Sequence, residues 1–324
     1  MKTNMHNAEI PIFFTIDDNY APFLATALNS AIKNSSDDRR YRAVILYQEL
    51  MLDNMKKIKA LETENFKIDF ITMCEGMETI TDRLSNRLRF DCFTLTIYFR
   101  LFIPTMFPQY DKGIYFDSDI VLLGDIAELY DIDIGDNLIG ACTDLSVQEI
   151  PRIVDYIENA VGVPRDKYIN SGVLLMNLKK LREVGLDKRF LKLLNKYHFD
   201  SVAPDQDYLN ALCHGRIHYL SPVWDAMPND NARPLSDARL VHYNLYSKPW
   251  YGEGVQYEEH FWKYAFDSGF IDSIMKHRDG WSEEQREKCR SAMEILCRRA
   301  SDITGNEVTF RNIYEKGEAI RLCL

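Results

Sequence analysis

Short apolar runs alternate with amphipathic segments along the first half of the chain, a pattern typical of a sheet built from β–α units. Residues 10–16 form an apolar run, a polar turn follows, and leucine and alanine then recur at helical spacing to residue 32. Residues 43–47 and 67–71 predict two further strands, with a helix over 51–61 between them. An open sheet with parallel strands therefore begins the chain.

The middle of the chain continues this pattern. We expect strands over 113–116, 136–144 and 172–178, and helical segments over 96–107, 148–161, 179–197 and 204–212. Residues 228–239 are rich in Pro, Asn and Asp and have no periodicity, so they predict an exposed loop.

The C-terminal part of the sequence predicts helices alone. Ser282 and Gln285 form the pattern of a capping box. In the helix that follows, one face is less polar than the others and is made by Cys289, Met293, Leu296 and Ala300. We therefore predict an α/β domain over 1–264 and a small helical appendage over 265–324.

Composition narrows the class of protein. The chain has 324 residues, of which 46% are hydrophobic and 27% charged, as in an ordinary folded protein. Its net charge of −10 argues against nucleic acid as a partner. The seven cysteines contain no C-x-x-C pair, and neither a signal peptide nor an apolar run of membrane-spanning length is seen. We expect a cytoplasmic protein, with weak contact to the inner membrane surface left open.

Two carboxylates follow the apolar run 113–116 and are the strongest chemical signal. In extended backbone Asp117 and Asp119 point to the same side while Ser118 faces away, so both carboxylates can approach one cation. Oxygen ligands suit Mg²⁺ or Mn²⁺. Two alternatives are a simple turn cap and a phosphatase with an aspartate nucleophile. The second is disfavoured because more than a hundred residues of α/β pattern precede Asp117.

Two other segments carry candidate chemistry. The turn Asp17–Tyr20 begins a helix, and a helix N-terminus favours anions, although these residues can equally form a plain N-cap. His242 can complete a Mn²⁺ site whose other ligands are carboxylates, and Lys248 can neutralise phosphate oxygens. The glycine-rich loops that usually bind dinucleotides and triphosphates are absent from the sequence.

Read together, these segments resemble glycosyltransferase family 8, the retaining nucleotide-sugar transferases that include the bacterial lipooligosaccharide galactosyltransferases and glycogenin. The resemblance covers about residues 10–250 and is carried by Asp17–Tyr20, Arg100, Asp117–Asp119, Asn170–Gly172, Asp205–Asp207 and His242–Trp250. One position departs from it. The family often has glycine three residues after the metal histidine, whereas this chain has Leu245.

The resemblance implies a GT-A fold, in which an open, mixed, Rossmann-like sheet carries helices on both faces. The donor would be bound by Thr15, Ile16, Asp17, Asn19, Tyr20, Arg100, Ser118 and Lys248. The ligands of Mn²⁺, or of Mg²⁺, would be Asp117, Asp119 and His242. The residues around the anomeric carbon and the acceptor would be Asp144, Asn170, Asp205 and Gln206.

The implied function is transfer of glucose or galactose from a UDP-sugar to a hydroxyl group of a glycan or glycolipid acceptor, such as a bacterial surface polysaccharide or lipopolysaccharide. The anomeric configuration would be retained. Two other functions stay open at this point: a metal-dependent phosphatase or nucleotidyltransferase that uses Asp117 and Asp119, and a nucleotide-sugar-binding protein without turnover.

Overall fold

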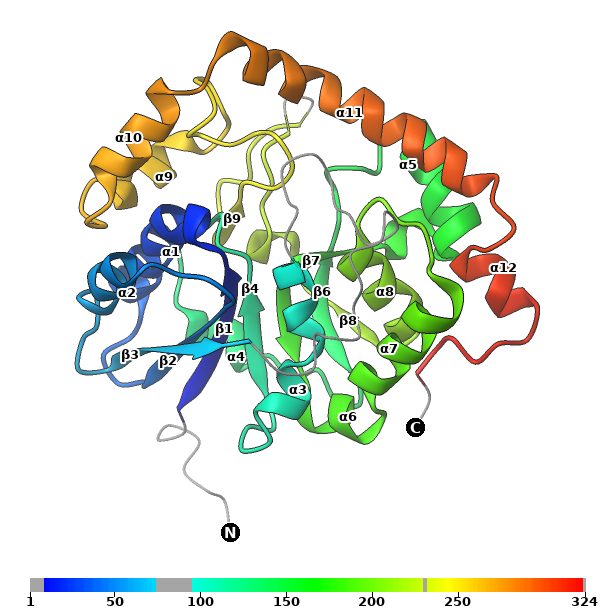
Figure 1. Ribbon diagram of the computed structural model, residues 1–324. Helices are drawn as coiled ribbons and strands as arrows, with labels where there is room; N and C mark the ends of the chain where they lie inside the picture. The colour runs from blue at the N-terminus through cyan, green and yellow to red at the C-terminus, as the bar shows by residue number, and fades with distance from the viewer. Residues whose placement is uncertain (1–8, 74–94, 230–231, 323–324) are drawn as a thin grey trace.

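A twisted sheet of seven strands forms the centre of the molecule, seen in the computed structural model, which describes residues 9–73, 95–229 and 232–322 (Figure 1). The strand order is β3-β2-β1-β4-β7-β6-β8. The strands are β1 (Ile10–Ile16), β2 (Tyr41–Tyr47), β3 (Phe66–Thr72), β4 (Gly113–Phe116), β6 (Ile139–Thr143), β7 (Ile169–Met176) and β8 (Ile217–Tyr219). Strands β3, β2, β1 and β4 are parallel, and β7 is antiparallel to both β4 and β6. The predicted open mixed sheet is confirmed.

Helices cover both faces of this sheet (Figure 1). They are α1 (Ala21–Asn34), α2 (Leu52–Lys59), α3 (Ile103–Met106), α4 (Ile126–Tyr130), α5 (Pro151–Tyr156), α6 (Leu178–Glu183), α7 (Leu186–Tyr197), α8 (Pro204–Cys213), α9 (Glu258–Ala265), α10 (Ile271–Asp279), α11 (Glu283–Thr304) and α12 (Phe310–Glu315). Two hydrophobic cores result, one on each face. Side chains alternate along β1, so Phe13 packs in one core while Ile12 and Phe14 pack in the other. This explains why β1 is apolar throughout.

Several predicted elements differ from the observed ones. The helix expected over 96–107 is a 3₁₀ helix (Leu95–Leu101) followed by α3, because Pro104 cannot sit inside a continuous helix. The helix expected over 179–197 is divided at Gly185, whose φ is +65°. Strand β7 begins at Ile169, so Asn170–Gly172 lie within the strand and not before it.

The C-terminal helices pack on both cores. The predicted capping box of Ser282 and Gln285 is present at the start of α11. Phe270 and Ile274 join one core, while Leu296 and Phe310 join the other. In Figure 1 α10 and α11 arch over the upper edge of the sheet toward α5 and α12. The division of the chain after residue 264 stays a prediction, and α9 runs across that position.

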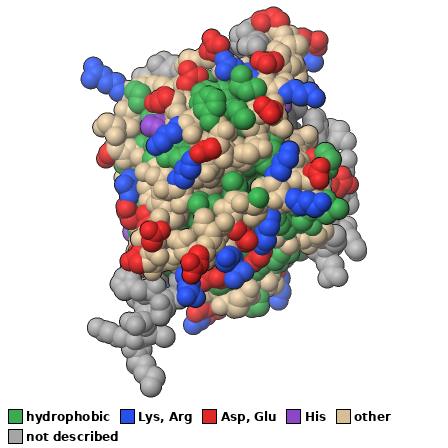
Figure 2. Space-filling model, turned by 90° about the vertical axis from the view of Figure 1, so that its left-hand side faces the viewer, with side chains coloured by type: hydrophobic (Ala, Val, Ile, Leu, Met, Phe, Trp, Pro, Cys, Tyr) green, Lys and Arg blue, Asp and Glu red, His purple; other side chains and the backbone are tan. Residues whose placement is uncertain are grey.

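The surface mixes charges of both signs. Figure 2 shows acidic and basic side chains interspersed on the side of the molecule that carries α1 and α2. In the part of the chain that the structure describes, no helix combines the length and apolar character needed to cross a membrane. The cytoplasmic location and the weak membrane contact stay predictions.

Candidate active site

A cleft opens at the carboxyl ends of β1 and β4, two neighbouring parallel strands. The chain leaves β1 toward β2 on one side and returns on the other side with β4, which makes this the point where open α/β sheets bind ligands. Thr15 and Ile16 end β1, and Asp117 directly follows β4. All three residues line the cleft.

Asp117 and Asp119 converge in a bend, not in the extended backbone that we expected. The Asp117 N–H donates to the Gly172 carbonyl (2.8 Å), and three residues later the chain enters the short strand β5 (Ile120–Leu122). Because the backbone turns between the two strands, Ser118 does not face away. It is buried and lines the cleft with both aspartates.

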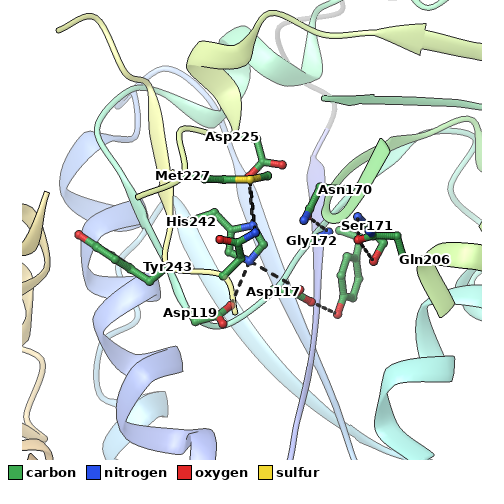
Figure 3. Close-up of polar contacts among 12 residues, drawn as sticks. Asp117, Asp119, Asn170, Ser171, Gly172, Gln206, Asp225, Met227, His242 and Tyr243 are labelled. Carbon is green, nitrogen blue, oxygen red and sulfur yellow. Dashed lines mark hydrogen bonds and ion pairs between the residues drawn. The ribbon is translucent and has the colours of Figure 1, made fainter. Parts of the chain in front are cut away.

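His242 reaches the two carboxylates through strand pairing. Strand β9 (Leu240–His242) runs antiparallel to β5 and places His242 opposite Ile120. Its Nε2 lies 3.4 Å from Asp119 Oδ1 and 3.8 Å from Asp117 Oδ2, and its Nδ1 lies 3.0 Å from Asp225 Oδ1 (Figure 3). The contact with Asp225 orients the ring so that Nε2 faces the aspartate pair.

These three side chains fit a divalent cation. One ligand atom from each of Asp117, Asp119 and His242 can be chosen so that all lie within 4.8 Å of one another. Two carboxylates and an imidazole whose other nitrogen contacts a buried carboxylate suit Mn²⁺, and water and phosphate oxygens can complete the shell. The structure thus brings together the three metal ligands predicted from the sequence.

Charges in this cluster hold one another in place. Burial alone would lower the pKa of His242, but contacts with Asp119 and Asp225 outweigh it and raise the pKa to about 10. Burial opposes ionisation of Asp119, yet Lys248 and His242 bring its pKa well below the usual range. Burial raises the pKa of Asp225 although His242 acts against it.

A buried arginine connects the metal cluster to the sugar side of the cleft. Arg100 Nη2 donates to Asp117 Oδ1 (2.9 Å), and its Nε lies 3.1 Å from Asp205 Oδ2. Its Nη1 donates to the Ser171 carbonyl (2.7 Å). The guanidinium stacks over the Tyr115 ring at 4.2 Å, while the Tyr115 hydroxyl donates to Asp117 (2.8 Å). Burial disfavours the charge, but the two aspartates keep the pKa of Arg100 above its ordinary value.

The residues predicted around the anomeric carbon form a second polar cluster beside Arg100. Asp144 Oδ2 accepts from Asn170 Nδ2 (3.2 Å) and from Gln206 Nε2 (3.0 Å). Ser171 links this cluster to Asp205, because its hydroxyl donates to Asp205 Oδ2 (2.9 Å) and its N–H donates to Gln206 Oε1 (3.0 Å). Figure 3 shows Asn170, Ser171 and Gln206 side by side. All four predicted residues around the anomeric carbon therefore meet in the cleft.

Asp207 fastens the helix that carries Asp205 and Gln206. Its fully buried carboxylate accepts from the hydroxyls of Tyr156 (2.5 Å), Tyr168 (2.6 Å) and Ser201. These contacts tie the first turn of α8 to α5 and to the start of β7. Asp207 therefore fixes where its two neighbours point.

The late loop brings Lys248 to the cleft. Its Nζ contacts Asp119 and donates to the Tyr243 carbonyl (2.8 Å). Trp250 anchors the loop by stacking on Phe23, with ring centroids 4.0 Å apart. Leu245 has a φ of +54°, the left-handed region that favours glycine. The loop therefore follows a path suited to glycine while presenting an aliphatic side chain to the cleft.

The predicted nucleotide-binding turn occupies one end of the cleft. Asp17 accepts from the N–H groups of Asn19 (3.0 Å) and Tyr20 (3.3 Å), and burial raises the pKa of Asp17 although these bonds act against it. Thr15 Oγ1 lies 2.9 Å from the Tyr115 hydroxyl. Thr15, Ile16, Asp17 and Tyr20 line the cleft, whereas Asn19 is exposed and is the one predicted residue outside the lining.

Several residues of the site were not assigned a role from the sequence. Ser171 and Gly172 lie inside the motif Asn170–Gly172, and Asp207 lies inside Asp205–Asp207, so the signal was present. Tyr115 lies two residues before Asp117 and reads only as part of an apolar strand. Asp225 lies 17 residues before His242 without a recognisable pattern, so only the fold reveals its contact.

The fold and the cleft define an α/β protein with a polar cleft at the strand ends and three side chains that fit a divalent cation. Comparison with known proteins identifies the family. The sequence model of glycosyl transferase family 8 matches residues 11–254, and the chain belongs to that family. Family membership favours a transferase over a phosphatase.

Individual relatives agree with this assignment. A Haemophilus influenzae relative is 28% identical over 220 residues, which cover 68% of this chain and 64% of that protein. The lipopolysaccharide 1,2-glucosyltransferase of Escherichia coli is 26% identical over 204 residues, or 58% of this chain and 59% of that enzyme. The matches thus span less than two thirds of either relative.

Solved structures resemble the whole domain. The galactosyltransferase LgtC in complex with donor and acceptor sugar analogues is 26% identical, with a TM-score of 0.67, over 86% of this chain and 100% of that one. The bifunctional glycosyltransferase WbbM, at 21% identity and a TM-score of 0.69 over 85% of this chain and 52% of that one, shares the fold. The GT-A fold expected from the sequence is confirmed.

Gly172 allows the metal cluster to close. A Cβ atom at this position would lie 2.3 Å from His242 Cε1 and 2.8 Å from Asp117 Oδ2. We predict that Gly172→Ala forces the ligands apart and weakens Mn²⁺ binding by about tenfold or more, as measured by titration calorimetry. Gly140→Ala, where the nearest side-chain atom is 3.2 Å away, is the matched control in β6. Equal Mn²⁺ affinity in wild type and Gly172→Ala would contradict the assignment of Asp117 and His242 as metal ligands.

Asp207 generates a prediction about stability. Asp207→Asn replaces an acceptor of three buried hydroxyls by a group that also carries donors, which leaves buried donors unpaired. We expect the free energy of unfolding, measured with urea, to fall by about 2 kcal/mol or more. Tyr168→Phe removes a single donor and should cost about 1 kcal/mol. A variant Asp207→Asn as stable as wild type would refute the anchoring role.

Proposed function

We propose that the chain transfers glucose or galactose from a UDP-sugar to a hydroxyl group of a glycan or glycolipid acceptor, and that it uses Mn²⁺ or Mg²⁺. The observation that carries this proposal is the convergence of Asp117, Asp119 and His242 beside Lys248 in one cleft. The LgtC complex supports a sugar donor and a sugar acceptor, and the Escherichia coli relative supports a lipopolysaccharide-type acceptor.

The charge of the cleft supports the need for a cation. Among the described residues, its lining contains five carboxylates but only Arg100 and Lys248 as cationic groups beside the imidazole of His242, which must be neutral to bind a metal ion. A diphosphate brought into this cleft would meet an excess of negative charge. A cation held by Asp117, Asp119 and His242 would neutralise that excess and stabilise the charge on the diphosphate leaving group.

The chain's own residues supply the remaining steps. The ammonium group of Lys248 is placed to contact phosphate oxygens, and Arg100 holds Asp117 and Asp205 in fixed positions. Asn170 and Gln206 lie beside them, where the sugar would bind, and Asp144 lies on the acceptor side. Closure by the loop around Leu245 would limit hydrolysis of the donor.

Lys248 should act on the diphosphate and not on the base. We predict that Lys248→Ala weakens UDP binding by about tenfold or more at saturating Mn²⁺ but leaves uridine binding nearly unchanged, since only UDP carries the opposite charge. Lys112→Ala, a half-buried lysine that donates to the Ile132 carbonyl, is the control. Equal losses for UDP and uridine would place Lys248 away from the phosphates.

The product should keep the configuration of the donor. Asp205 Oδ2 already contacts Arg100 and Ser171, so it is poorly suited to act as the strong base that an inverting enzyme needs. In a same-face route the departing phosphate accepts the proton of the attacking hydroxyl. We predict an α-linked product from an α-linked UDP-hexose, identified by proton NMR of the new linkage.

A role of Asp205 in stabilising charge on the sugar predicts the kinetics of the Asp205→Asn variant. The carboxylate would stabilise the positive charge that develops on the sugar, so the variant should lower kcat far more than it raises the KM for the donor. A β-linked product would contradict both the retaining route and the role of Asp205.

A further inference from the structure

The lining of the cleft divides into two parts with different chemistry. The ends of β1 and β4, together with β7, contribute charged and amide side chains. A second part of the lining is formed by the aliphatic side chains of Val147, Ile153, Val202, Leu245 and Leu296, and the lining also includes Tyr168 and Asn244. The five aliphatic residues come from the turn after β6, from α5, from the segment before α8, from the late loop and from α11. Val147 follows Asp144 by three residues and Val202 precedes Asp205 by three, so this aliphatic wall adjoins the groups expected around the reacting sugar.

Leu296 belongs to helix α11 and brings that helix into the lining of the cleft. Trp281, just before α11, stacks on Tyr251 of the late loop, with ring centroids 4.0 Å apart. Further along α11, Glu294 pairs with Arg152 of α5 (2.7 Å). Leu296 joins the hydrophobic core that also contains Ile153. Helix α11 therefore connects the loop that carries Lys248 with α5, and Figure 1 shows it crossing above the sheet.

The aliphatic wall restricts what can lie against it. It contributes no charged side chain among the described lining residues, so a charged group placed there would lose water without gaining a partner. An alkyl chain would instead bury apolar surface. The polar groups of the donor would bind in the charged part of the cleft. The aliphatic wall would then contact the acceptor.

We propose that Leu296 determines acceptor specificity and that the preferred acceptor is an uncharged sugar that carries an apolar substituent. This inference rests on the proposed function, because it assigns the aliphatic wall to the acceptor of that reaction. It gives α11 a part in substrate selection in addition to its packing on α5.

The test compares hexyl and methyl glycosides of glucose and of galactose. Dissociation constants are measured by ligand-observed NMR with the full chain saturated with UDP and Mn²⁺, so turnover is not needed. Wild type should bind at least one hexyl glycoside about tenfold more tightly than its methyl counterpart, and Leu296→Ala should lose most of that preference. Ile295→Ala, which changes an exposed neighbour on α11, should retain it. Leu296→Val removes one carbon, disturbs folding less and should lose part of the preference.

The outcomes separate this inference from the proposed function. If wild type binds UDP with Mn²⁺ but shows no preference for hexyl glycosides, binds neither kind of glycoside, or keeps its preference in both Leu296 variants, the role of Leu296 is refuted and the donor site stands. If wild type does not bind UDP in the presence of Mn²⁺, the proposed function itself fails and this inference with it.

Discussion

The crowding of carboxylates at the floor of the cleft is the constraint on which the rest of the site depends. Asp117, Asp119 and Asp205 line the same cleft, and their negative charges would repel one another if no positive charge lay between them. Arg100 sits between Asp117 and Asp205, and Lys248 contacts Asp119, so each buried cation holds acidic groups in place. Removing either cation would leave buried negative charge unpaired, which is costly in a protein interior.

The fold brings these charges together from distant parts of the chain. Asp117 directly follows β4, Asp205 comes from α8, and Lys248 comes from the loop after β9. The antiparallel pairing of β5 with β9 places His242 beside the aspartates, and Asp225 fixes the imidazole from behind. The geometry is thus set by backbone pairing, and the side chains need little freedom to meet a cation and a diphosphate.

Sequence patterns predicted the alternating strands and helices and singled out Asp117 and Asp119, because these depend on local features. The resemblance to the family supplied the GT-A fold and the roles of most other candidate residues. Apolar runs gave the order of strands and helices, and the motif around Asp117 stood out against buried neighbours. Three other features depend on tertiary packing. They are the bend that turns Ser118 into the cleft, the contact of Asp225 with His242, and the place of Leu296 in the lining. The periodicity of the sequence cannot predict such contacts because the partners come from separate elements. The loop predicted over 228–239 includes residues 230 and 231, which lie outside the described residues.

The most direct test of the central claim is UDP binding with and without a divalent cation. The account predicts that wild-type protein stripped of metal with EDTA binds UDP weakly, and that added Mn²⁺ strengthens binding by about a hundredfold, or ~2.7 kcal/mol, in titration calorimetry. The negative charge of the cleft requires this difference. Equal affinity for UDP in EDTA and in Mn²⁺ would contradict the account, because Arg100 and Lys248 alone would then suffice to bind the diphosphate.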